Sequence, residues 1–174
     1  MLDISSGNSP VSPIAGAPAL ADKVRFLGRG DSYAPFVETV LARETHMSWV
    51  FKAGERVYKL KKPVRFPFLD FSTLPRRETA CRAEFSLNRR LAPDVYLAVV
   101  PLTMARGALA IGGDGTVVDW LVVMRRLDEA KTLETAMIGH GLTPLWADRI
   151  AARLGRFYRH TRTVPIRPEA LLRN

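Results

Sequence analysis

Three charged residues near the middle of the 174-residue chain have the types and spacing of a phosphate-binding site. Lys59 and Lys61 share one face of an extended stretch, residues 56–65, because strand side chains alternate. Glu84 lies at the centre of an apolar stripe on the helix expected at 74–91, so it must pair with a cation to be buried cheaply. We expect Lys59 to pair with Glu84 and to face phosphate, with Lys61 as the alternative.

Each of these residues also has a plainer interpretation. Lys59 and Lys61 could form the solvated rim of a strand, and the Glu84 side chain could extend to the edge of its helix. Lys59 is preferred to Lys61 because it lies in the more apolar part of the strand.

Two further segments could contact a nucleotide. Thr45 and Ser48 lie in a turn without glycine, and their hydroxyls and backbone amides could reach phosphate, although a simple hairpin turn fits equally. Val123, Met124 and Arg125 end an apolar stretch that runs into a polar link before a helix. This pattern fits a hinge whose backbone binds adenine, but an ordinary buried strand end would have the same sequence.

The elements that must position these residues predict an α+β fold. Residues 1–22 are rich in Ser, Pro, Gly and Ala and are expected to be a flexible leader, with order beginning near Lys23. We expect a five-stranded antiparallel sheet with one long helix after the third strand, which is the layout of a protein-kinase-like small lobe. The expected strands are 37–44, 46–52, 56–65 and 95–104, followed by a hairpin of two segments, 108–111 and 116–127, which counts as the fifth strand. The expected helices are 74–91, 128–137 and 144–160.

Composition excludes several classes of protein. The chain is 47% hydrophobic and 25% charged, which excludes wholesale disorder, and its single cysteine, Cys81, excludes an internal disulfide. No apolar run is long enough to span a membrane, so we expect a cytoplasmic protein. The net charge of +9 suits an anionic ligand. A nucleic-acid-binding domain is the less favoured interpretation of this charge, because no strand interleaves aromatic and basic residues.

Residues 44–102, which include VYKLKKPVRFPFLDFST and NRRLAPDVYL, resemble the bacterial aminoglycoside-phosphotransferase-like family. The resemblance extends over about residues 37–160 and is closest to an uncharacterised branch sometimes fused to a P-loop ATPase-like domain. It implies that Lys59 holds the α- and β-phosphates of ATP, that Glu84 pairs with Lys59, and that Val123 to Arg125 form the adenine hinge.

The same resemblance implies a large lobe with a His-Gly-Asp catalytic loop and magnesium ligands. After Leu127 the chain contains two aspartates, Asp128 and Asp148, and neither follows His-Gly. Loss of a catalytic base alone costs roughly 10²–10⁴ in rate. We therefore expect a small lobe, residues 23–127, followed at 128–174 by the first helices of an incomplete large lobe, with ATP as ligand and without catalysis by this chain alone.

The last expected helix carries an apolar stripe that needs a cover: Trp146, Ile150, Leu154 and Phe157. The tail Val164 to Leu172, the sheet, a missing large lobe, a partner chain or a second copy could supply it. A non-enzymatic protein–protein interaction module is therefore the main alternative to an ATP-binding lobe.

Overall fold

The computed structural model describes residues 17–139, 141 and 143–161, and these fall into two compact units that divide after Arg126. The first unit contains two α-helices, a short 3₁₀ helix and eight strands, and the second contains a 3₁₀ turn and two α-helices. Their bounds are α1 Leu20–Leu27, the 3₁₀ helix Gly30–Ser32, β1 Val40–Glu44, β2 Ser48–Ala53, β3 Arg56–Lys61, β4 Arg65–Phe66, β5 Leu69–Asp70, α2 Leu74–Arg89, β6 Tyr96–Ala105, β7 Ala108–Ile111, β8 Thr116–Arg125, the 3₁₀ turn Glu129–Lys131, α3 Leu133–Gly139 and α4 Pro144–His160.

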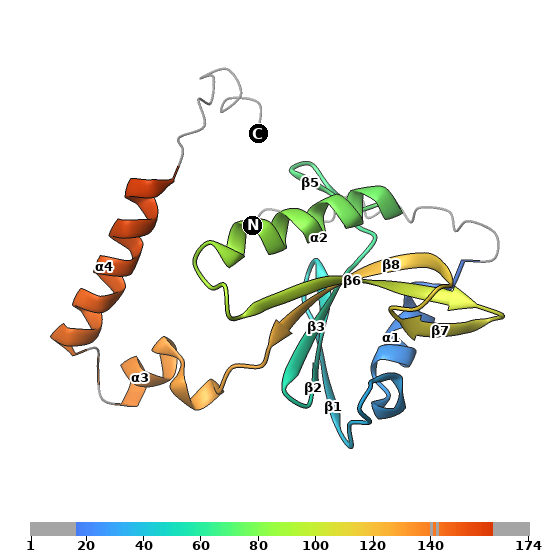
Figure 1. Cartoon of the computed structure of the whole chain (residues 1–174), viewed down its shortest axis with the longest axis horizontal. Coiled ribbons are helices and arrows are strands. Elements are labelled where there is room, and N and C mark those ends of the chain that lie inside the picture. The colour runs from blue at the N-terminus through green and yellow to red at the C-terminus, as the bar shows by residue number, and fades with distance from the viewer. Residues whose placement is uncertain (1–16, 140, 142, 162–174) are drawn as a thin grey trace, which may run out of the picture. The chain divides into compact units, whose positions relative to one another are not determined.

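The main sheet has six antiparallel strands in the order β1-β2-β3-β8-β6-β7 (Figure 1). The α+β class is therefore confirmed, but the expected number of five strands is wrong. The sixth strand is β7, which pairs with the end of β6 through a tight turn and adds a short edge strand. Strand β8 lies at the centre because it returns between β3 and β6.

The expected leader is wrong at its C-terminal end, because α1 already begins at Leu20. The Asp22 carboxylate accepts a hydrogen bond from the Ala19 amide, 3.2 Å away, and this closes the first turn. Leu20, Val24 and Leu27 then recur at helical spacing and pack on the core. Residues 1–16 lie outside the described part of the chain.

Two other predicted elements also differ. The helix expected at 128–137 is a 3₁₀ turn, Glu129–Lys131, followed by α3 from Leu133. The Thr132 hydroxyl accepts a hydrogen bond from the Thr135 amide at 3.2 Å, so a new helix start separates the two. The long strand expected at 56–65 ends at Lys61, because Pro63 cannot continue the ladder and a separate β4–β5 hairpin follows.

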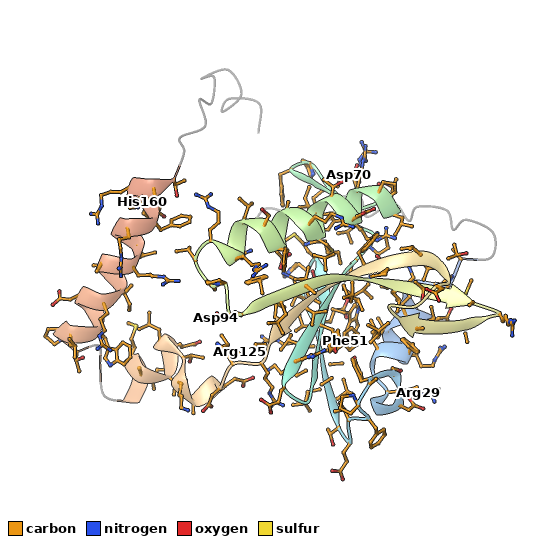
Figure 2. The ribbon with its side chains drawn as sticks, in the orientation of Figure 1. Arg29, Phe51, Asp70, Asp94, Arg125 and His160 are labelled. Carbon is orange, nitrogen blue, oxygen red and sulfur yellow. The ribbon has the colours of Figure 1, made fainter. Side chains whose placement is uncertain are left out.

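Helices α1 and α2 lie on opposite faces of the sheet (Figure 1). The face toward α1 is closed, and Figure 2 shows the side chains that fill it, Phe51 among them. Its buried residues come from four strands and from α1: Leu27, Phe51, Tyr58, Leu60, Leu102, Leu121 and Val123. The Tyr33 hydroxyl donates to the Leu27 carbonyl at 2.5 Å and ties the segment after α1 to the helix.

The face toward α2 is covered only in part. Helix α2 begins at the N-cap Thr73, whose hydroxyl accepts from the Arg76 amide, and Pro75 sits in the first turn. It packs on β8 and β6, with Cys81 fully buried between them. On β1, Leu41 remains 53% exposed. The two faces of the β1–β3 part of the sheet therefore differ in burial.

This difference predicts unequal costs for two leucine truncations. Leu60→Ala, on the closed face, should destabilise the protein by about 2–5 kcal/mol, because it leaves a cavity in the core. Leu41→Ala should change stability by less than about 0.5 kcal/mol, as is usual for exposed positions. Urea denaturation measures both, and equal costs would mean that the face of Leu41 is as well packed as that of Leu60.

Candidate functional site

One carboxylate holds both strand lysines. The Lys59 ammonium lies 2.9 Å from Glu84 Oε1, and the Lys61 ammonium lies 2.7 Å from Glu84 Oε2. The predicted Lys59–Glu84 pair is thus confirmed, and Lys61 joins it instead of replacing Lys59. Glu84 does not extend to the helix edge, since only 14% of its side chain is exposed.

The two lysines differ in their access to solvent. The Lys61 side chain is 6% exposed, and its ammonium lies 4.7 Å from the centroid of the Phe71 ring, where it gains a cation–π contact. The Lys59 side chain is 29% exposed. Lys61 therefore anchors Glu84 from inside the protein, whereas Lys59 is the cation of this cluster that a ligand can reach.

The cluster lowers the pKa of Glu84. Burial by itself raises the pKa of this carboxyl group, but hydrogen bonds and charges from Lys61 and Lys59 outweigh burial and bring the pKa below its ordinary value. The carboxylate form therefore prevails at neutral pH. With two ammonium groups and one carboxylate, the cluster carries one net positive charge.

An apolar strip adjoins Lys59 on the same face of the sheet. Val50 lies directly opposite Lys59 in the β2–β3 register, and Val57 lies opposite Met124 in the β3–β8 register. On β1, Leu41 lies opposite Lys52, which in turn lies opposite Val57, so one lysine interrupts the row. Leu41 is exposed and the other three are half-buried, in contrast to the closed face behind them. We call Leu41, Val50, Val57 and Met124 the open strip.

The turn that contains Thr45 and Ser48 is a tightly bonded hairpin. The Thr45 hydroxyl donates to the Ser48 carbonyl at 2.8 Å and accepts from the Ser48 amide at 3.0 Å. Ser48 is buried. The Thr45 side chain and the Ser48 backbone therefore serve the turn, and a phosphate contact from either residue stays a prediction.

The expected hinge residues lie within strand β8. Val123 and Met124 are paired on both sides, with β3 and with β6, and the Arg125 amide donates to the Val95 carbonyl at 2.8 Å. Arg125, labelled in Figure 2, is the last residue of the strand. Sheet pairing engages the backbone of these residues, and adenine binding by them stays a prediction. The Met124 side chain belongs to the open strip, where a ligand could contact it.

A second buried ionic cluster was not found by sequence reasoning. Asp119, 1% exposed, accepts from the Lys23 ammonium at 2.7 Å and from Arg77 Nε at 2.8 Å. Lys23 comes from α1 and Arg77 from α2. The available signal was an aspartate within the apolar stretch Val117 to Met124, which requires a buried cationic partner.

The cysteine has a structural role, and the described residues offer no metal cluster. Cys81 is buried, as expected of a core residue, and burial is the main cause that raises the pKa of its thiol to about 12. Among residues 17–139, 141 and 143–161 no group of three or more His, Cys, Asp or Glu side chains is arranged to hold a metal ion.

In the second unit, α4 begins at the N-cap Thr143 and runs to His160, as expected. Trp146 is 55% exposed and Leu154 is 40% exposed. The tail Val164 to Leu172, one predicted cover for this stripe, lies outside the described residues, so the nature of the cover stays a prediction. No helix among the residues described is both long and apolar enough to cross a bilayer.

Comparison with known proteins finds uncharacterised mycobacterial relatives. One is from Mycobacterium bovis and two are from Mycobacterium tuberculosis, strains CDC 1551 and H37Rv, and each is 41% identical over 125 residues. The match includes 71% of this chain and 23% of each relative, so the chain spans about a quarter of their length. No family model and no solved structure matches the chain.

The site predicts a measurable order of pKa effects. By ¹³C NMR titration of glutamate carboxyl groups, the pKa of Glu84 should lie below its ordinary value of 4.5. Lys61→Met should raise the pKa more than Lys59→Met, because Lys61 is the more buried of the two cations. The matched control is Lys62→Met, since Lys62 pairs with Glu44 and not with Glu84.

The sign of the stability effect follows from the lowered pKa. The folded state holds the Glu84 proton less tightly than the unfolded state. The ionised Glu84 therefore contributes its full stabilisation of the fold above pH 4.5, the ordinary pKa. This contribution is lost as the pH falls through the lower pKa of Glu84 in the folded state. A Glu84 pKa at or above its ordinary value would contradict the shared-carboxylate geometry.

Proposed function

We propose that residues 17–126 bind the phosphates of a nucleotide such as ATP, as the small lobe of an aminoglycoside-phosphotransferase-like kinase. The observation that carries the proposal is the shared Glu84 carboxylate, which Lys61 anchors from the interior while Lys59 stays partly exposed beside the open strip.

Charge supports an anionic ligand. The Lys59–Lys61–Glu84 cluster has one uncompensated positive charge, and such a charge in a half-buried site attracts an anion more strongly than it would in bulk water. The Lys59 ammonium has three N–H donors, and one of them donates a hydrogen bond to Glu84 Oε1. Phosphate oxygens are suitable acceptors for the others, because charge-assisted hydrogen bonds are the stronger kind.

The open strip supports a ligand with a flat apolar part. Val50 and Val57 flank Lys59 across and along the strands, so a base lying on them would have its phosphates within reach of a lysine. Ligand sites commonly combine an apolar lining with a few polar groups that fix orientation. Adenine attached to phosphates has this combination, which free phosphate lacks.

The order of the elements also supports this family. Three strands of the main sheet, β1 to β3, precede the helix that carries Glu84, and β6 and β8 follow it in the same sheet. In kinases a lysine of the third strand pairs with a glutamate of the following helix, as Lys59 does with Glu84 here. Strand β7 is an addition at the edge remote from this pair.

Nucleotide binding is tested by calorimetry with ADP and with adenosine. Lys59→Met should weaken ADP binding by about 10- to 100-fold, because a hydrogen bond to a charged group is worth about 1.5–3 kcal/mol. It should change adenosine binding little. Lys62→Met is the control, since Lys62 is held by Glu44 at 2.7 Å and is not part of the cluster. Equal ADP affinity of Lys59→Met and wild type would refute the proposed role of Lys59.

Binding is proposed here without turnover. The purified chain with MgATP should release phosphate no faster than its Lys59→Met variant, because neither aspartate after Leu127 follows His-Gly in a catalytic loop. A malachite-green phosphate assay measures this. ATP hydrolysis that depends on Lys59 would contradict this expectation, because it would require a catalytic base or metal ligand not identified among these residues.

A further inference from the structure

A buried ionic cluster around Asp119 connects α1 and α2 through the sheet. The Lys23 ammonium of α1 donates to Asp119 Oδ2 at 2.7 Å and to the Val118 carbonyl at 2.8 Å. From the other face, Arg77 of α2 donates through Nε to Asp119 Oδ1 at 2.8 Å. All three side chains are at least nine-tenths buried. A single carboxylate of β8 therefore bonds to both helices.

Arg77 also fixes the start of α2. Its Nη1 donates to the carbonyls of Phe71 and Ser72 at 3.1 and 3.3 Å, just before the N-cap of the helix. A buried guanidinium with these partners leaves the first turn of α2 little freedom. Breaking such a buried set at one member is strongly destabilising, because the remaining charges lose their partners.

The first turn of α2 and the candidate site lie on one face of the helix. Arg77 and Glu84 are seven residues apart, about two helical turns, so both point toward the sheet. Between them the Cys81 thiol contacts the Trp120 carbonyl at 3.8 Å. A rigid helix that moves at Arg77 therefore moves Glu84 as well, and with it the carboxylate that orients Lys59.

We propose that α1 is a positioning element of the Lys59–Glu84 site. It acts through Lys23, Asp119 and Arg77, which fix the position of α2 on the sheet. Lys23 holds the Asp119 carboxylate in the orientation that receives Arg77. Anything that detaches α1 from the sheet, such as a partner bound to this helix, would then make the position of Glu84 less fixed, although α1 and Glu84 lie on opposite faces of the sheet. The effect on nucleotide affinity rests on the proposed function, whereas the effect on Glu84 does not.

The test uses the full chain with Lys23→Met, which removes the ammonium and keeps the length of the side chain. Amide hydrogen exchange of α2 residues 81–85 and the NMR-measured pKa of Glu84 are the readouts. Lys23→Met should speed exchange in 81–85 by about tenfold or more and raise the Glu84 pKa toward its ordinary value. The control is Arg25→Met on the same helix, because Arg25 pairs with exposed Asp22 and not with Asp119. Lys23→Arg should restore both readouts in part.

Asp119→Asn provides a second variant if Lys23→Met does not fold. Its amide keeps an oxygen for Arg77 but turns a donor toward Lys23, so it should release α1 and change both readouts in the same direction. Unchanged exchange in 81–85 and an unchanged Glu84 pKa in a folded variant would overturn the proposal. If both readouts shift while neither the wild type nor the variant binds ADP, the positioning role holds and the proposed nucleotide function fails.

Discussion

The Glu84 carboxylate, shared between Lys59 and Lys61, is the interaction on which the candidate site depends. A carboxylate in a half-buried position is stable only with cationic partners, and one partner would have satisfied it. The second lysine leaves a net positive charge. This charge is accessible to solvent at Lys59, because Lys61 is buried and its ammonium lies over the Phe71 ring. Anion attraction thus follows from charge balance and burial.

This arrangement requires that α2 be held in a fixed place over the sheet. Asp119 secures its beginning through Arg77, and Glu84 secures its later turns through β3. The α1 face supplies the closed core that keeps the strands together, so the opposite face can leave the open strip accessible. The closed core and the open strip therefore lie on opposite faces of one sheet.

The sequence was informative where a periodic pattern and a charge coincided. Alternation in β3 and helical spacing in α2 were enough to predict the Lys59–Glu84 pair. Lys23 was missed because α1 lies in a Pro- and Ala-rich stretch, and Asp119 because its partners are distant in sequence by 96 and 42 residues. Local sequence did not reveal that Val123 and Met124 each pair with two neighbouring strands, and the adenine contact expected of Val123 to Arg125 stays a prediction.

The central claim is that Lys59, and not another cation, meets the ligand phosphates. Its most direct measurement is NMR of the lysine side chains, labelled at Cε, during titration with ADP. The account predicts a large saturable shift at Lys59, a smaller one at Lys61 through the shared carboxylate, and none at Lys62. Saturable ADP binding with the Lys59 signal unmoved would contradict it.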